Sequence, residues 1–338
     1  MLAKVKLPLD SSNIDGRKYD EQRGEIGGFG AVPEKIEIAQ RIVHDGEVNR
    51  ARYLPSKPNV IATKCVSGAV AIFDYTKHAS QPDADQRSAK PDLVCTGHTK
   101  EGFSLAWSPV KAGLLLSGSE DTSICMWDVE AAPRAQRELA PLKTYSGHKA
   151  GVQDVAFHPH SDSVFASCSD DGYLFLWDQR QGGKPSQSVS AHQSEANSLA
   201  FNPYCEFVLA TGSGDNTVAM WDLRSLKTAL HTFVGHQGEV LRVEWAPFSE
   251  RILASGGNDR RVHLWDCARI GAEQTAEDAE DGVPELLFVH GGHTGKVYDL
   301  HWNPNEAWVL GSTSEDNVLQ VWAMAESIYA EDEKIRED

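Results

Sequence analysis

Histidine, serine or threonine, and aspartate recur together along this chain, and they are the residue types of a hydrolytic charge relay. In such a relay the histidine takes the proton of an exposed hydroxyl while the aspartate orients the imidazole. His148, Ser167 and Asp171 form one such set, and equivalent sets recur up to six times. An enzyme needs one nucleophile beside one base, whereas these trios repeat at equivalent positions. We therefore expect structural hydrogen-bonding groups, no catalytic residues and no enzyme.

The spacing inside these sets is fixed. Six histidines are each followed, 30 residues later, by the second position of a dipeptide that resembles Trp-Asp. The pairs are His44 and Asp74, His98 and Asp128, His148 and Asp178, His192 and Asp222, His236 and Asp266, and His293 and Ala323. Counted from the histidine, position +9 is aromatic, +11 is proline and +19 is Ser or Thr in all six units. A strand must end near +11, because proline cannot donate to a strand ladder.

This pattern resembles the WD-repeat proteins, in which each unit supplies one four-stranded blade of an all-β propeller. The resemblance implies that the histidine, hydroxyl, aspartate and tryptophan of a unit form a buried hydrogen-bond network. Four complete networks are expected, formed by His98, Ser117, Asp121 and Trp127; His148, Ser167, Asp171 and Trp177; His192, Thr211, Asp215 and Trp221; and His236, Ser255, Asp259 and Trp265.

Two ways of closing the ring follow from the residues before the first unit. Residues 35–43 alternate like an outer strand, and residues 2–7 (LAKVKL) alternate like the third strand of a blade. We favour a seven-bladed template in which residues 1–43, with a glycine-rich connection, form an incomplete first blade. The alternative is a closed six-bladed ring in which the 35–43 strand completes the last blade. Residues 44–323 then hold six repeats, and residues 324–338 form an acidic, helical or frayed C-terminal tail.

Composition restricts the partners and the compartment. The chain has 49 acidic and 32 basic residues and a formal net charge of −17, which disfavours nucleic acid and anionic membranes and favours basic partners. The six cysteines are scattered without a metal-binding spacing, as in proteins of a reducing compartment. No apolar run is long enough for a membrane span. We expect no metal, no cofactor, and a location in the nucleus or cytosol.

Binding side chains are expected on the rim formed by positions +3, +5 and +22, because loops at one end of a propeller vary while its buried faces are committed to packing. Carboxylates occupy four of the +3 positions and three of the +22 positions. They are Glu47, Glu101, Glu195 and Glu239, and Glu120, Asp170 and Glu315. Amides and apolar groups stand at +5. This rim is suited to an extended peptide that carries Arg or Lys.

A second candidate surface is the acidic insert at 271–285, the longest linker between repeats. Its acidic density predicts a solvated loop, followed by an apolar outer strand that contains Phe288 and Val289. An amphipathic basic helix could contact both the loop and the strand.

Several stretches resemble a narrower family, the retinoblastoma-binding, histone-binding WD-repeat proteins that include the small subunit of chromatin assembly factor. They are 46–53 (GEVNRARY), 73–78 (FDYTKH), 202–204 (NPY), 210–213 (ATGS), 277–282 (EDAEDG) and 284–288 (PELLF). The resemblance covers essentially the whole chain. It implies a nuclear chaperone and scaffold that binds histones three and four and is shared by chromatin assembly, histone deacetylase and remodelling, Polycomb and histone acetyltransferase complexes.

The resemblance also assigns binding residues. The histone three tail is expected on the rim at Glu47, Asn49, Arg50, Glu101, Phe103, Gln153, Asn197 and Glu315, with Gln153 standing where the family usually has an acid. The first helix of histone four is expected at Glu277, Asp278, Asp281, Gly282, Phe288 and Val289. The family's N-terminal helix and first two strands have no counterpart in this sequence, so we expect weak binding at that second site. A competing interpretation is a cytosolic WD-repeat adaptor, such as a ubiquitin-ligase substrate receptor, that uses the same rim.

Overall fold

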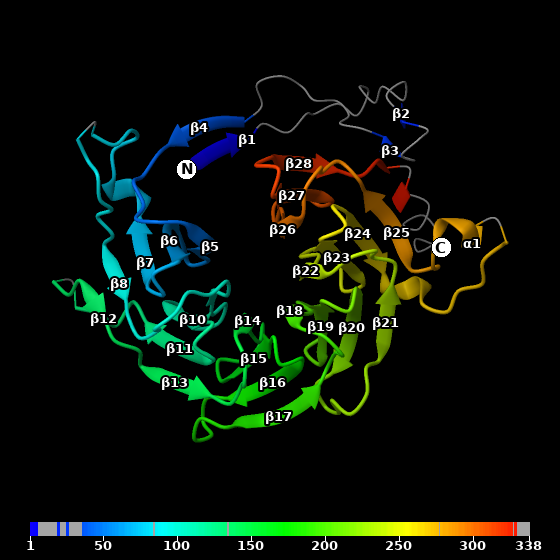
Figure 1. Ribbon diagram of the computed structural model, residues 1–338, viewed down its shortest axis with the longest axis horizontal. Helices are drawn as coiled ribbons and strands as arrows, with labels where there is room; N and C mark the ends of the chain where they lie inside the picture. Colours follow the sequence, from blue (N-terminus) through cyan, green and yellow to red (C-terminus); the bar gives the residue numbers. More distant parts are fainter. Residues whose placement is uncertain are drawn as a thin grey trace.

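The computed structural model describes residues 1–5, 19–20, 25–26, 36–83, 85–133, 135–276, 278–326 and 328–329. Antiparallel sheets stand side by side around a central axis, each with its first strand innermost (Figure 1). The all-β propeller predicted from the repeat spacing is confirmed, and six blades make up the ring.

Each blade is built from consecutive strands. The first contains β5 (Val48–Leu54), β6 (Lys57–Cys65), β7 (Val70–Asp74) and β8 (Leu93–Cys95), and β12 (Glu138–Leu139) adds in parallel to β8. The second contains β9 (Ala106–Trp107), β10 (Leu114–Gly118), β11 (Ser123–Asp128) and β13 (Lys143–Ser146). The third contains β14 (Val152–Phe157), β15 (Val164–Ser169), β16 (Tyr173–Asp178) and β17 (Pro185–Ser190).

The second half of the ring follows the same order. The fourth blade contains β18 (Ala196–Phe201), β19 (Val208–Ser213), β20 (Thr217–Asp222) and β21 (His231–Val234). The fifth contains β22 (Val240–Trp245), β23 (Ile252–Gly257), β24 (Val262–Asp266) and β25 (Leu286–His290). The sixth has three described strands, β26 (Val297–Trp302), β27 (Val309–Ser314) and β28 (Leu319–Ala323). In every blade the first strand ends just before the +11 proline.

The first strands carry a β-bulge in five of the six units. The register shifts between Val48 and Arg50, Val152 and Asp154, Ala196 and Ser198, Val240 and Arg242, and Val297 and Asp299. A bulge leaves one extra residue unpaired and re-aims its side chain. In these five units that residue is position +5, so its side chain is presented at the end of the strand rather than within the ladder.

The hydrophobic core lies between neighbouring blades. Trp127, Trp177 and Trp265 at the ends of third strands are completely buried, and each belongs to a cluster that joins two blades. Such clusters join the first blade to the second and continue around to the sixth. Burial of large apolar side chains at about 25 cal/mol per Å² is the main stabilising term for such contacts. The junction between the sixth blade and the first, called the seam below, is built differently.

Two short strands lie at the seam. β1 (Leu2–Val5) pairs with β4 (Ile36–Gln40) in a separate two-stranded sheet between β28 and the first blade (Figure 1). The six blades match the six-bladed alternative of the sequence analysis in number. However, β4 pairs with β1 and not, among the described strands, with β28, so it does not complete the sixth blade. The seven-bladed template that we favoured from the sequence is not what the ring shows.

The remaining described elements are small. β2 (Tyr19–Asp20) pairs with β3 (Glu25–Ile26) next to the glycine-rich connection, most of which lies outside the described residues. The helical segments are η2 (Tyr75–Lys77), η3 (Cys267–Arg269) and α1 (Asp278–Asp281). Of the C-terminal tail, Ile328 and Tyr329 pack against the sixth blade. In the described part of the chain, none of the helices could cross a membrane.

Candidate functional site

The predicted hydrogen-bond network is formed in the third, fourth and fifth blades. In the third, His148 Nδ1 lies 3.1 Å from Asp171 and His148 Nε2 lies 2.7 Å from Ser167 Oγ, which also accepts the indole N–H of Trp177 at 2.8 Å. Ser167 is fully buried. The Ser167 hydroxyl donates its single proton to His148, and its oxygen accepts from Trp177. This buried hydroxyl therefore cannot reach a substrate. The other two networks have the same connections.

The network predicted for the second blade is wrong in two of its contacts. His98 Nδ1 lies 3.3 Å from Asp121, but Nε2 contacts the Ser117 carbonyl rather than its hydroxyl, and the Trp127 indole donates to the Thr96 carbonyl. This blade also differs in having Lys64 of β6 close by: Lys64 is fully buried, and its charge is attracted to Asp121. Burial, together with Lys64, lowers the pKa of His98 to about 4.

The sixth unit, which was not predicted to be complete, has a related network. His293 Nε2 lies 2.7 Å from Ser312 Oγ, and the Trp322 indole donates to the same oxygen at 3.1 Å. Asp316 is more distant, with 3.8 Å between its carboxylate and His293 Nδ1.

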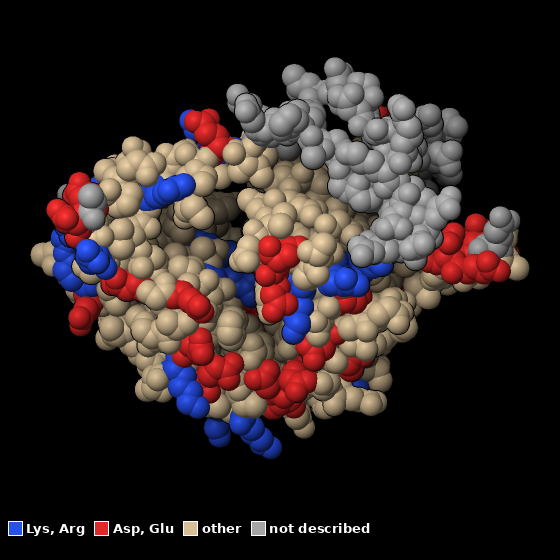
Figure 2. All heavy atoms as spheres, turned by 45° about the horizontal axis from the view of Figure 1, so that its top comes forward, with Lys and Arg blue, Asp and Glu red and all other residues tan. Residues whose placement is uncertain are grey.

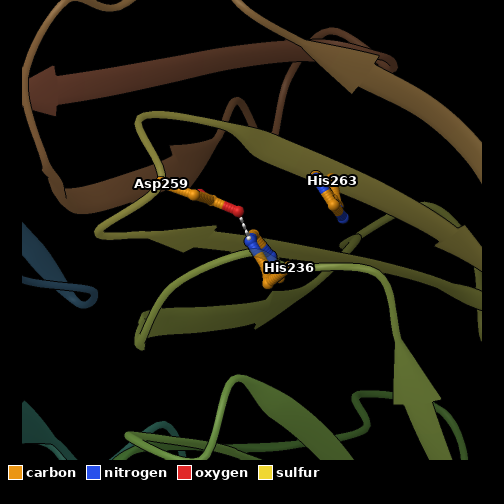
Figure 3. Close-up of side chains that lie close together, drawn as sticks. All are labelled: His236, Asp259 and His263. Carbon is orange, nitrogen blue, oxygen red and sulfur yellow. Dashed lines mark hydrogen bonds and ion pairs between the residues drawn. The ribbon is translucent and has the colours of Figure 1, made fainter.

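One cluster has the composition of a metal site. Nitrogen and carboxylate atoms of His236, Asp259 and His263 lie within 4.8 Å of one another (Figure 3). However, His236 already uses Nδ1 for Asp259 and Nε2 for Ser255, and the two imidazoles are stacked with 3.8 Å between centroids and 10° between planes. The lone pairs of imidazole nitrogens lie in the plane of the ring, so two stacked, parallel rings hold them in separate parallel planes and do not aim them at one ion. Phe175 stacks on His148 in the same way, so we interpret position +27 as a packing position.

The rim geometry agrees across all six units. In each unit the backbone N–H of +22 donates to the carbonyl of +3, at 2.8–3.4 Å, which brings the two sets of side chains to one end of the ring. Asp and Glu side chains gather around the mouth of the central hollow, and Lys and Arg atoms are visible inside it (Figure 2). Glu47, Glu195, Glu239 and Glu315 are exposed.

The +5 side chains connect the carboxylates of the rim. The Gln153 amide lies 2.8 Å from both Glu120 and Asp170, and the Asn49 amide donates to Glu101 at 3.1 Å. Burial and the nearby Glu120 and Glu195 raise the pKa of Asp170 above its usual value. The rim therefore contains a cluster of acids that repel one another, and a cation placed there would relieve that repulsion.

Of the remaining rim residues, the aromatic ones are exposed, whereas Asn197 and Arg50 are held by contacts within the protein. Phe103 is 41 % exposed and Tyr298 49 % exposed, so aromatic surface lies beside the carboxylates. Asn197 is half-buried and donates to the Val240 carbonyl. Arg50 was expected on the rim, but its charge does not face the rim. Its guanidinium donates to the Phe103 carbonyl at 2.7 Å and lies 2.8 Å from Asp299. The bulge at position +5 turns Arg50, at +6, inward.

Position +6, which the sequence analysis did not consider, forms a belt of polar side chains around the axis. Its members are Arg50, Ser104, Asp154, Ser198, Arg242 and Asp299. Arg242 bridges Asp154 at 2.8 Å and Asp299 at 3.3 Å, and Arg52 makes a two-pronged contact with Asp299 at 2.9 and 3.0 Å. The sequence offered one signal for this belt, namely that position +6 carries arginine in some units and aspartate in others. We call these six residues and Arg52 the belt.

The charged residues of the belt shift the pKa values of one another. Burial raises the pKa of Asp299, but Arg50, Arg52 and Arg242 outweigh this and hold it well below the usual range. Burial lowers the pKa of Arg50 to about 10. Since Arg50 and Arg52 belong to the first blade and Asp299 to the sixth, the belt joins the two blades across the seam.

Residues 271–276 and 278–281 of the acidic insert are exposed, as its composition predicted, whereas Glu285 at its end is buried and lies 2.6 Å from His231. The insert contains α1, whose first residue, Asp278, exchanges hydrogen bonds with Thr275. Asp281 is exposed, and Gly282 adopts a φ of +137° that favours glycine. On β25, Phe288 is half-buried and Val289 is 37 % exposed, while Glu277 lies outside the described residues. At this second candidate surface, the exposed carboxylates of Asp278 and Asp281 thus come shortly before the apolar side chains of Phe288 and Val289 in the sequence.

Comparison with known families supports the repeat assignment. A family model described as "WD domain, G-beta repeat" matches residues 89–128, 139–178, 183–222, 227–266 and 284–323. The matches cover more than half of the chain and end at the second position of the Trp-Asp-like dipeptide.

Proposed function

Because the chain belongs to the WD-repeat family, we propose that it is a non-enzymatic scaffold of the retinoblastoma-binding, chromatin assembly type, which binds the basic tail of histone three on its acidic rim. The observation that carries the proposal is the set of carboxylates at equivalent +3 and +22 positions around the channel mouth, joined by the Gln153 and Asn49 amides.

Charge and shape explain why such a tail would suit the rim. An extended Arg- or Lys-bearing peptide can donate charge-assisted hydrogen bonds to Glu101 or Glu315 and place a cation over Phe103. The net charge of −17 attracts basic chains over distances beyond contact. A nuclear location and assembly into chromatin complexes follow from the resemblance, and binding of histone four would use Asp278, Asp281 and the strip at Phe288 and Val289.

Charge reversal on the rim tests the proposal. Glu101→Lys and Glu315→Lys should each weaken binding of a histone three tail peptide by about 1–3 kcal/mol, the scale of hydrogen bonds to charged groups. Titration calorimetry at two salt concentrations measures both affinity and salt dependence. Glu138→Lys, on the outer strand β12, is the matched control and should leave the affinity unchanged. Unchanged affinity for both rim variants would rule out the rim as the binding site.

A further inference from the structure

The amide of Gln153 lies between two carboxylates that belong to neighbouring blades. Its Nε2 atom donates to Glu120 Oε1, from the second blade, and to Asp170 Oδ2, from the third, and both separations are 2.8 Å. Because both neighbours are anionic acceptors, only the nitrogen end of the amide can face them. Both hydrogens of this nitrogen are therefore used within the rim.

The backbone brings the three side chains together. Gln153 is the extra residue of the bulge in β14, so its side chain leaves the ladder and is presented at the rim. Asp170 is held nearby, since its N–H donates to the Gly151 carbonyl at 3.0 Å. Gly151 also leaves room for Glu120, because a Cβ atom there would lie 2.5 Å from the Glu120 carboxylate. A larger residue at this position would displace Glu120 from Gln153.

The nitrogen of Gln153 stands where the donor of a bound cation would stand. A charged N–H donor lies about 2.7–2.9 Å from a carboxylate oxygen. An ammonium group can donate to two carboxylates at once, because it carries three N–H bonds. Gln153 Nε2 meets the oxygens of Glu120 and Asp170 at such a distance, but as a neutral donor.

The surroundings of Asp170 show that this neutral donor offsets the local negative charge only in part. Burial raises the pKa of Asp170, and the hydrogen bond from Gln153 lowers it. The charges of three neighbouring carboxylates raise it again, namely those of Glu120, Glu195 and Asp171. The balance is a pKa above the usual value, so the site would still gain from a full positive charge.

The other amides at position +5 are engaged differently. Asn49 donates to one carboxylate, that of Glu101, and Asn197 donates to a backbone carbonyl. Among the described residues at position +5, Gln153 is thus the one whose amide joins two carboxylates.

We propose that Gln153 is an internal occupant of a cation subsite of the rim, where its amide nitrogen takes the place of an N–H donor of a bound basic side chain. This role rests on the proposed binding of basic chains at the rim, and it names the residue that limits affinity there. A basic side chain that bridges Glu120 and Asp170 must first displace the amide, and the loss of two hydrogen bonds offsets part of the gain from a charged donor.

Titration of the Asp170 carboxyl by NMR tests this role without a ligand. Gln153→Ala removes the donor and leaves the two carboxylates side by side, so the pKa of Asp170 should rise by about 0.5 or more. Gln153→Lys supplies an ammonium and should lower this pKa below that of the unmodified chain. Gln187→Ala, at an amide of β17 that donates to the Leu223 carbonyl, is the matched control and should leave it unchanged. An unchanged pKa of Asp170 in both Gln153 variants would overturn the proposal.

Affinity for a tetralysine peptide is the second readout. At pH 7.5 and low salt, Gln153→Ala should bind the peptide about threefold more tightly than the unmodified chain, because no amide has to be displaced. Its affinity should also fall more steeply toward pH 5, since a proton then competes for Asp170. Loss of a direct contact between Gln153 and the ligand would give the opposite result, weaker binding.

The two readouts separate this role from the rim function itself. If the unmodified chain binds tetralysine and Gln153→Ala binds it equally or more weakly at pH 7.5, the proposal is overturned while the rim remains the binding site. If neither form binds the peptide, the proposed rim function is wrong, and the titration of Asp170 alone decides whether Gln153 fills a cation position.

Discussion

Replacing Asp299 with asparagine should lower the free energy of unfolding by about 2–4 kcal/mol, because it leaves three guanidinium groups of the belt without their shared carboxylate. Removing one partner of a buried ion pair costs about 3–5 kcal/mol. The lower range applies here since the Asp299 side chain remains 30 % exposed and water screens part of the interaction. The loss should be concentrated at the seam, where Arg50 and Arg52 reach Asp299.

Urea denaturation measures this effect, with Asp162→Asn as the control. Asp162 is an exposed residue of the turn between β14 and β15, and a substitution there should change stability by less than about 0.5 kcal/mol. Hydrogen exchange should show faster opening of β5 and β26 in the Asp299 variant than of β14 and β18. Equal stability of the two variants would show that the belt does not hold the seam.

Stability should also fall as the pH drops below about 6.5. Burial lowers the pKa of His98 and His290 to about 4 and that of His263 to about 3, so the folded chain keeps these imidazoles neutral. An unfolded histidine takes up its proton near pH 6.5. Between pH 6.5 and 4 the unfolded state therefore binds more protons, and each histidine removes about 1.4 kcal/mol of stability per pH unit.

The replacement His263→Phe isolates one of these contributions. Phenylalanine already stacks on the network histidine of the third blade, at 4.1 Å and 12°, so the fifth blade should accept the same pair. Urea midpoints from pH 7.5 to 5 should fall less steeply for this variant, which should retain about 2 kcal/mol more stability than the unmodified chain at pH 5. Parallel curves would mean that His263 is protonated in the fold without cost.

The sequence predicted the elements that repeat. Fixed spacing from each histidine located the strand ends, the +3 and +22 rim positions and the buried Trp177 network. It could do so because equivalent positions of the repeat occupy equivalent places in every blade. It could not predict the exchange of partners at His98, or that Lys64 from a neighbouring blade helps to lower the pKa of this histidine. Contacts between blades have no fixed spacing along the chain.

Side-chain direction was the other limit. Simple alternation placed +3 and +5 on one face, whereas the bulge makes +5 the extra residue and turns Arg50 inward to Asp299. A bulge leaves the residue types of a strand unchanged, so the pattern of apolar residues does not reveal it. Closure of the ring likewise depended on whether β4 paired with β1 or with β28, and both alternatives fit the same alternating residues.

The central claim, that the acidic rim binds a basic tail through specific carboxylates, is tested most directly by exchanging charges between protein and peptide. Glu101→Arg should weaken binding of a histone three tail peptide, and peptides with one Arg or Lys replaced by Glu should bind the unmodified chain more weakly. For one of these peptides, Glu101→Arg should restore at least about 1 kcal/mol of the combined loss in a double-mutant cycle. If the losses add for every peptide position, Glu101 does not contact the tail, which contradicts the account.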